Sequence, residues 1–328
     1  MPASAVRPRT GFRLGTHLVR RGLALAPMAG NTNLAYRRLC RKFGAELTTT
    51  EMVSACALVH QDRKSLRLLA RGEDEVPVAA QLFGTEPALL AEAARRVEDL
   101  GFHAVDFNMG CPVPKITGGG GGSALLREPE TAARCIEAMA SAVSIPVTAK
   151  IRAGWDDAHR NAPEVARLLE AAGVQVLTVH GRTREQKYAG RSDYRLIGEV
   201  VAAVSVPVIG NGDVDGPERA AELLAQGVAG IAVGRGALGR PWLFARLAAQ
   251  IDGRPEPPPP AAAERRRLLI ELAEGVCALH GEGIGMRIMR RLAADFFRDT
   301  PGAAEMRRRC QRLERLEDLR RLALGRAA

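Results

Sequence analysis

Short apolar runs alternate with longer amphipathic segments over the first 250 residues, and this alternation constrains the fold more than any other feature. Eight such runs occur, at 23–26, 47–50, 78–82, 104–108, 147–151, 176–180, 206–210 and 231–234. The segments between them have helical patterns, and several end at a glycine, the residue that best tolerates the left-handed position after a helix. Eight alternating strands and helices over about 220 residues predict an α/β fold, a (β/α)8 TIM barrel.

A doubly wound open sheet is the alternative for such an alternating pattern. That fold normally carries a Gly-x-Gly-x-x-Gly turn after its first strand. Here the first run leads into the sequence APMAGN at residues 26–31, so the barrel is favoured.

The composition changes after Phe244. The segment RPEPPPP at 254–260 cannot form a helix and predicts a stiff linker. Residues 264–321 favour helix almost throughout, with a break near Thr300–Gly302. We therefore predict a barrel domain over 1–250, a proline-rich linker over 251–263 and an all-α C-terminal domain over 264–328.

Arginine dominates the charge of the protein. The formal net charge is +10, from 47 basic and 37 acidic residues, and only five of the basic residues are lysines. Residues 261–328 contain fifteen arginines against ten acidic residues, a net charge of +5. A basic helical domain indicates a polyanionic partner, since the guanidinium group suits phosphates. The alternative is an arginine-rich composition that places solvated charges on every helix face.

The cysteines and the hydropathy pattern restrict the compartment. None of the six cysteines has Cys-x-x-Cys spacing, so we expect reduced thiols rather than a zinc site or a disulfide framework. No apolar stretch approaches the roughly 18 residues that cross a bilayer, and the first twenty residues lack the apolar run of a secretion signal. We expect a cytoplasmic protein without a metal or a membrane segment.

Polar residues stand where the predicted strands end, which is where barrel enzymes place their active sites. Gln81, Asn108, Lys150 and His180 lie at the ends of the third to sixth strands, and Cys111 lies just beyond the fourth. The seventh and eighth strands lead into Asn211-Gly212-Asp213 and Gly234-Arg235-Gly236. Barrels commonly bind a phosphate with these last two loops, so the glycine turns and Arg235 predict a phosphate site.

Lys150 interrupts an apolar strand, and an unpaired buried ammonium costs several kcal/mol. It should therefore face the barrel mouth and an anionic group. One interpretation is a Schiff-base lysine, and the other is a fixed cation beside a reduced flavin. His180 and Gln81 add hydrogen-bonding groups that fit the edge of a flavin ring, although His180 could also be a core histidine.

Cys111 follows its strand in the sequence NMGCPVPK, where Gly110 and Pro112 predict a tight turn at the barrel mouth. A thiol with an ordinary pKa is mostly protonated at neutral pH, so Cys111 can act as an acid. The alternatives are that Cys111 acts as a nucleophile or that it is a small buried apolar residue.

Eight sequence blocks together resemble the tRNA-dihydrouridine synthases, most closely their bacterial B-type branch. The blocks are APMAGNT (26–32), TEMVS (50–54), AQLFG (80–84), DFNMGCP (106–112), AKIRAGW (149–155), VHGRTR (179–184), GNGD (210–213) and VGRGALGRPW (233–242). The resemblance extends over about residues 12–325. It implies an FMN-binding barrel and a C-terminal helical domain that helps to hold tRNA.

The resemblance also implies roles for individual residues. It implies cofactor contacts at Pro27, Met28, Ala29, Gln81, Lys150, His180, Asn211, Gly212, Asp213, Gly234 and Arg235, and substrate contacts at Asn108, Arg152, Arg182 and Arg287. Cys111 corresponds to the proton donor. NADPH would reduce FMN, and a flipped-out tRNA uridine would then receive hydride at C6 and a proton from Cys111 at C5.

Some positions depart from the family pattern. Gly118–Gly122 form an uncharged run where relatives usually carry one or two basic residues. Asn33 replaces a common aspartate, and Leu292 and Asp295 stand where a histidine and an aromatic residue are usual. These departures leave the RNA contacts and the target uridine open.

Two other functions fit parts of the pattern. A flavin barrel oxidoreductase that acts on a free small molecule, such as a dihydroorotate or dihydropyrimidine dehydrogenase, is the first. The basic tail and the lack of clustered cysteines for iron–sulfur ligation argue against it. The second is an RNA-binding protein without catalysis, which the retention of Cys111, Lys150 and His180 disfavours.

Overall fold

Eight parallel strands form a closed barrel in the computed structural model, which describes residues 10–298 and 302–324. The strands are β3 (Leu23–Leu25), β4 (Leu47–Thr49), β6 (Val78–Phe83), β7 (Ala104–Met109), β8 (Val147–Arg152), β9 (Val176–His180), β10 (Val208–Asn211) and β11 (Gly230–Val233). Neighbours pair in the order β4-β3-β11-β10-β9-β8-β7-β6, and the β4–β6 pairing completes the ring. The predicted fold class is therefore confirmed, and each strand overlaps its predicted run.

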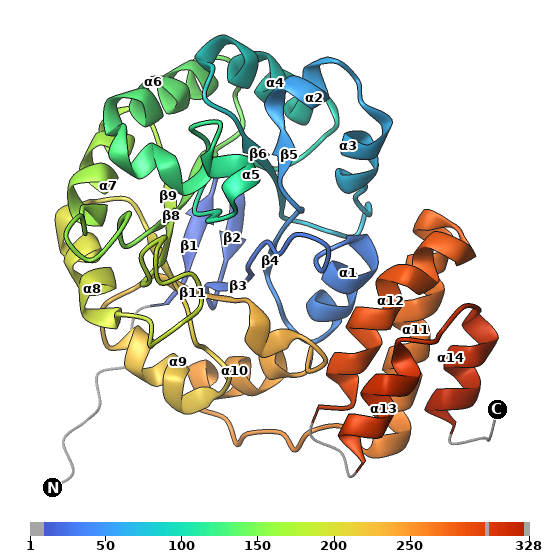
Figure 1. Ribbon diagram of the computed structural model, residues 1–328. Coiled ribbons are helices and arrows are strands. Elements are labelled where there is room, and N and C mark those ends of the chain that lie inside the picture. Colours follow the sequence, from blue (N-terminus) through green and yellow to red (C-terminus); the bar gives the residue numbers. More distant parts are fainter. Residues whose placement is uncertain (1–9, 299–301, 325–328) are drawn as a thin grey trace, which may run out of the picture.

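Helices surround this ring of strands (Figure 1). They are α1 (Leu34–Lys42), α2 (Ala55–Val59), α3 (Arg63–Leu68), α4 (Pro87–Asp99), α5 (Pro114–Thr117), α6 (Pro129–Ala140), α7 (Ala162–Ala171), α8 (Tyr194–Ala203), α9 (Pro217–Leu224) and α10 (Leu243–Asp252). Prolines near the starts of α4, α6, α7 and α9 fit the first helical turn, where no backbone N–H donor is needed. After α4, Gly101 takes the left-handed conformation (φ 76°) expected of a glycine that follows a helix.

Shorter elements extend the loops. The two-residue strand β5 (Val53–Ser54) pairs with β6, and two 3₁₀ turns, η1 (Gly122–Arg127) and η2 (Arg235–Ala237), follow β7 and β11 in the chain. These elements bring loop residues over the carboxyl ends of the strands.

An antiparallel hairpin that the sequence pattern did not predict covers the amino-terminal end of the barrel. It consists of β1 (Phe12–Leu14) and β2 (His17–Val19). Phe12, Leu14 and Val19 pack against small and apolar side chains near the starts of the strands, including Ala104 and Val176. The barrel is therefore sealed at this end and open at the other.

Four helices follow the barrel: α11 (Ala262–His280), α12 (Glu282–Phe296), α13 (Ala303–Cys310) and α14 (Leu316–Ala323). Figure 1 shows them beside α1, at the end of the segment that leaves α10. The break predicted near Thr300–Gly302 falls largely on residues 299–301, which lie outside the described residues. Gly281 (φ 78°) makes a further break between α11 and α12 that was not predicted.

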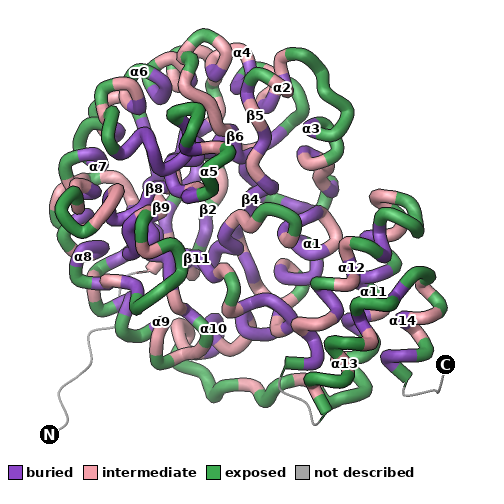
Figure 2. Tube along the Cα trace, in the orientation of Figure 1, coloured by how far each residue is buried: buried purple, intermediate pink, exposed green. Residues whose placement is uncertain are grey.

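The helical part packs against the barrel through α1 and α11, and Lys42 on α1 pairs with Glu271 on α11 at 2.9 Å. Buried residues line the barrel wall and the facing sides of the surrounding helices, whereas exposed residues form the outer surface (Figure 2). In the described ranges, no helix is both long and apolar enough to cross a membrane.

Candidate active site at the barrel mouth

The carboxyl ends of the strands open into a cavity of about 970 Å³. Fourteen of the sixteen predicted site residues line it: Pro27, Met28, Ala29, Gln81, Asn108, Cys111, Lys150, Arg152, His180, Asn211, Gly212, Asp213, Gly234 and Arg235. They are far apart in the sequence, and the closed barrel brings their strand ends together. The cavity is at the upper end of the usual range for a small-molecule site, so it has room for a cofactor and part of a substrate.

Cys111 lies in a fixed turn after β7. The Cys111 N–H donates to Asn108 Oδ1 at 3.0 Å, and Ser123 donates its hydroxyl to the Cys111 carbonyl at 2.9 Å. Burial raises the pKa of the Cys111 thiol, and the nearby Arg152 and Lys150 oppose this only in part. The thiol is therefore protonated at neutral pH, as a proton donor must be.

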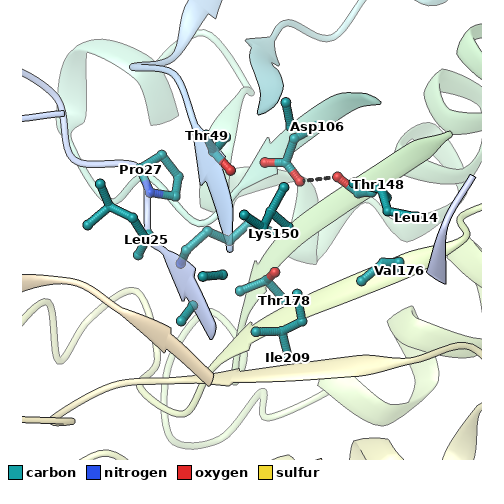
Figure 3. A pocket seen from close by; sticks show the side chains of 15 residues that line it. Leu14, Leu25, Pro27, Thr49, Asp106, Thr148, Lys150, Val176, Thr178 and Ile209 are labelled. Atoms are coloured by element: carbon teal, nitrogen blue, oxygen red, sulfur yellow. Dashed lines mark hydrogen bonds between the residues drawn. The ribbon is translucent and has the colours of Figure 1, made fainter. Parts of the chain in front are cut away.

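Lys150 stands between the cavity and a small chamber inside the barrel. The chamber has a volume of about 20 Å³, and Asp106, Thr148 and Thr178 contribute polar groups to its wall. Figure 3 shows Lys150 between Asp106 and Thr178. Burial and the neighbouring Arg152 lower the pKa of Lys150 to about 8, against the attraction of Asp106. The ammonium is therefore charged at neutral pH, and an anion in the cavity would stabilise that charge further.

His180 is neutral in this setting. Burial lowers the pKa of His180 well below its usual range, and the surrounding cations Lys150, Arg152 and Arg182 lower it further. Arg182 Nη1 lies 3.4 Å from His180 Nε2. Because a guanidinium can only donate, Nε2 is the acceptor, and Nδ1 carries the ring proton.

The two predicted phosphate loops lie side by side because β10 pairs with β11. Asp213 takes a left-handed conformation (φ 53°), and one of its carboxylate oxygens lies 3.7 Å from Arg235. A Cβ added to Gly234 would lie 3.8 Å from Met28 Sδ, and both residues line the cavity. Glycine at position 234 leaves space for a bound group between this loop and the loop after β3, which carries Met28.

Arg152 and Arg182 connect the loops around the barrel mouth through hydrogen bonds and an ion pair. Arg152 donates to the carbonyls of Gly110, Thr183 and Lys187 at 2.7–3.0 Å. Arg182 does not line the cavity, and it pairs with Asp213 at 2.7 Å. The observed contacts of both guanidinium groups are with the protein itself, so their predicted role in substrate binding stays a prediction.

Arg287 lies outside the cavity, exposed on α12. Among the departures, Asn33 caps α1 by accepting from the Tyr36 N–H at 3.1 Å. Leu292 is buried, and Asp295 pairs with Arg298 at 2.7 Å. Of the glycine run, Gly121 and Gly122 are buried, whereas the first three residues are exposed.

Sequence reasoning missed a cationic rim around the cavity. Arg191, Arg219, Arg240 and Arg298 line it, together with the exposed Tyr188. The guanidinium of Arg235 lies 4.5 Å from the centre of the Tyr188 ring. Arg191 follows the VHGRTR block closely and could have been found as part of that loop, whereas Arg298 lies two residues beyond α12 and carries no sequence signal.

Fold and site together define the class of protein: a TIM-barrel protein with an enzyme-type site at the carboxyl ends of its strands. Among the described residues, no group of three or more His, Cys, Asp or Glu side chains could hold a metal ion.

Comparison with known proteins identifies the family. A sequence model described as Dihydrouridine synthase (Dus) matches residues 24–326. The tRNA-dihydrouridine synthase B of Pseudomonas aeruginosa is 43% identical over 305 residues, 92% of this chain and 91% of that protein. The probable tRNA-dihydrouridine synthase of Rhodobacter capsulatus is 45% identical over 270 residues, 81% of this chain and 83% of that protein. The chain belongs to the dihydrouridine synthase family, and the resemblance seen in the sequence is confirmed.

A more distant likeness concerns the fold alone. The solved structure of histamine dehydrogenase from Rhizobium sp. 4-9 superposes with a TM-score of 0.59 at 13% identity. The superposed region covers 82% of this chain and 51% of the histamine dehydrogenase chain.

Proposed function

We propose that this protein reduces the C5=C6 bond of a uridine in tRNA to dihydrouridine, using FMN and NADPH. Membership of the dihydrouridine synthase family supports the reaction. The observation that carries the proposal is that the Cys111 thiol, whose pKa is raised by burial, lines the same cavity as Lys150 and two glycine loops. A proton donor and a cofactor cradle within one cavity are what this reduction needs.

The residues present fit FMN. Lys150 has a lowered pKa and gains from an anionic neighbour, so it would stabilise the negative charge of a reduced flavin ring. The neutral His180 can donate from Nδ1 to a ring oxygen or nitrogen. Gly234 and Arg235 would hold the phosphate beside Asn211 and Gly212. When bound, FMN supplies the hydride that adds to C6 of the uracil ring.

Cys111 completes the reduction. Addition of hydride at C6 leaves an electron pair at C5, which takes the Cys111 proton and forms the new C–H bond. Burial opposes the thiolate that remains, and this favours its reprotonation from solvent. Because the target bond is stacked inside folded RNA, the uridine must be flipped into the cavity.

The charges around the cavity favour tRNA over a free pyrimidine. Arg191, Arg219, Arg240 and Arg298 line its rim, and the phosphates that flank a flipped nucleotide would lie near this rim. A free base offers no such phosphates. We therefore propose that the C-terminal helices and this rim bind tRNA, and that NADPH reduces the cofactor before the RNA enters.

Cys111→Ala tests the proton donor. The variant should bind FMN like the wild type but reduce tRNA about 10²–10⁴-fold more slowly, the usual cost of losing a general acid. The measurement is dihydrouridine formation in unmodified tRNA, with free uridine as the comparison substrate. Cys56→Ala, which changes an exposed cysteine on α2, is the matched control and should keep full activity. Undiminished turnover by Cys111→Ala, or efficient reduction of free uridine, would contradict the proposal.

A further inference from the structure

A continuous series of side-chain hydrogen bonds runs from the barrel interior to the turn that carries Cys111. Gln81 donates from Nε2 to Asp106 Oδ2 at 2.7 Å, and Asn108 donates from Nδ2 to Gln81 Oε1 at 2.8 Å. Asn108 Oδ1 in turn accepts from the N–H groups of Gly110 and Cys111, at 3.2 and 3.0 Å. We call Asp106, Gln81 and Asn108 the amide series.

The direction of every bond in the amide series is fixed. The two backbone N–H groups after β7 can only donate, so Asn108 must turn its oxygen toward them. Its NH₂ group then has to meet the oxygen of Gln81, and the NH₂ group of Gln81 has to meet an acceptor. Asp106 is that acceptor, and its other oxygen receives a bond from Thr148 Oγ1 at 2.6 Å (Figure 3).

All three members of the series are buried. Asp106, Gln81 and Asn108 are 5%, 1% and 7% exposed. A donor or acceptor left without a partner in such a place costs more than an ordinary hydrogen bond gains, so the bonds of a buried network support one another. Loss of the acceptor at one end would therefore favour reorientation of both amides.

We propose that Asp106 is a positioning residue that holds the Cys111 turn in place through Gln81 and Asn108. The proposal rests on the proposed function of Cys111 as the proton donor. The turn depends on an acceptor at position 106, whereas the negative charge of Asp106 acts on its other neighbour, Lys150. Acceptor geometry and charge can be separated by substitution.

Two variants of Asp106 separate the acceptor geometry from the charge. Asp106→Asn keeps a carbonyl oxygen that can face Gln81, and its NH₂ group can donate to Thr148 Oγ1, so the amide series keeps its direction. Asp106→Val removes the acceptor and leaves the Gln81 NH₂ group without a partner. Asp106→Ala is measured in parallel, because it removes the acceptor without adding apolar bulk. Thr148→Val, which removes a bond outside the amide series, is the control.

Hydrogen–deuterium exchange of the peptide covering 108–113 reads the turn directly, on the full chain without RNA. We expect the Gly110 and Cys111 amides to exchange at least tenfold faster in Asp106→Val and Asp106→Ala. Asp106→Asn and Thr148→Val should match the wild type. A thermal melt of each variant separates this local loosening from global unfolding.

Single-turnover reduction of tRNA gives the second readout. Asp106→Val should lower the rate constant at saturating tRNA at least tenfold with little change in the tRNA concentration that gives half the maximal rate, and Asp106→Asn should restore most of it. Wild-type exchange in Asp106→Val, or an Asn variant as defective as the Val variant, would overturn the proposal. If Cys111→Ala keeps full turnover while the exchange results hold, the proton-donor role fails and the positioning role stands.

Discussion

The arginines of the barrel mouth and those of the C-terminal helices have different environments. Arg152 and Arg182 are each 2% exposed, and their guanidinium groups bond to loop carbonyls and to Asp213. On α13, Arg307 and Arg308 are exposed, and within the part of the chain that the structure describes Arg308 pairs with a carboxylate of its own helix, Glu305. A buried guanidinium with several protein acceptors supports the structure, whereas an exposed one is available to a phosphate. The net charge of the protein therefore overstates the number of guanidinium groups that are available to bind a polyanion.

Arg182→Met should give the largest effect on stability. It removes the 2.7 Å ion pair with Asp213, which keeps only the longer contact with Arg235, and the hydrogen bonds to the carbonyls of Ala189 and Gly190. We expect the free energy of unfolding to fall by about 3 kcal/mol, as for other broken buried ion pairs. Urea unfolding measures it, with Arg191→Met, an exposed position on the same loop, as the control at under about 0.5 kcal/mol. Equal losses in the two variants would remove the distinction between buried and exposed arginines at the mouth.

The pH dependence of FMN binding tests the proposed partner of Lys150. Its pKa in the protein without cofactor is about 8, lowered mainly by burial. An anionic ligand beside the ammonium would raise this pKa, so binding above pH 8 takes up a proton. The affinity for reduced FMN, whose ring carries the negative charge, should therefore fall as the pH rises above about 8, by up to tenfold per pH unit.

Anaerobic titration with reduced FMN between pH 7 and 9.5, followed by the change in flavin absorbance, measures this dependence. Lys150→Met should bind FMN more weakly and lack the dependence. A wild-type affinity that stays constant over this range would show that Lys150 does not face the anionic part of the ligand.

The double variant Arg307→Gln/Arg308→Gln should have the smallest effect, and only on RNA binding. For every phosphate that the two guanidinium groups bind, the variant should make the salt dependence of tRNA affinity shallower by about one unit of slope. The thermal midpoint should not change, because both residues are exposed. Arg320→Gln is the control, since Arg320 bonds to Glu274 at 2.7 Å on α11. If the control changes the slope equally, the tail acts through its overall charge rather than through particular contacts.

The barrel could be predicted from sequence because its strands are continuous apolar runs and its helices repeat between them. The β1–β2 hairpin could not, because its apolar residues pack on strand starts that come together only when the ring closes. The division between α11 and α12 was missed, although three glycines stand close together in GEGIG at 281–285 and the helix ends at the first of them, Gly281.

The positions of the site residues were predictable for a geometric reason: a residue that points inward at the carboxyl end of a barrel strand reaches the mouth. The orientations of the side chains were not. Arg152 turns toward carbonyls of the loop after β9, whose path depends on Arg182 and Asp213. Asp106 lies within an apolar run, and its role becomes visible only through its hydrogen bonds to Gln81 and Thr148. Arg298 reaches the rim from another part of the chain.

Gly122 has a consequence for the design of covalent inhibitors. A Cβ at this position would lie 2.8 Å from the Cys111 carbonyl oxygen and 3.2 Å from Cys111 Cβ, so the buried end of the glycine run covers one side of the thiol. An electrophilic warhead has to approach from the cavity, along the path that the uracil ring would take. Its selectivity within the protein is then decided against Cys56, which is exposed, and Cys277, which is half-buried, because Cys40, Cys135 and Cys310 are buried.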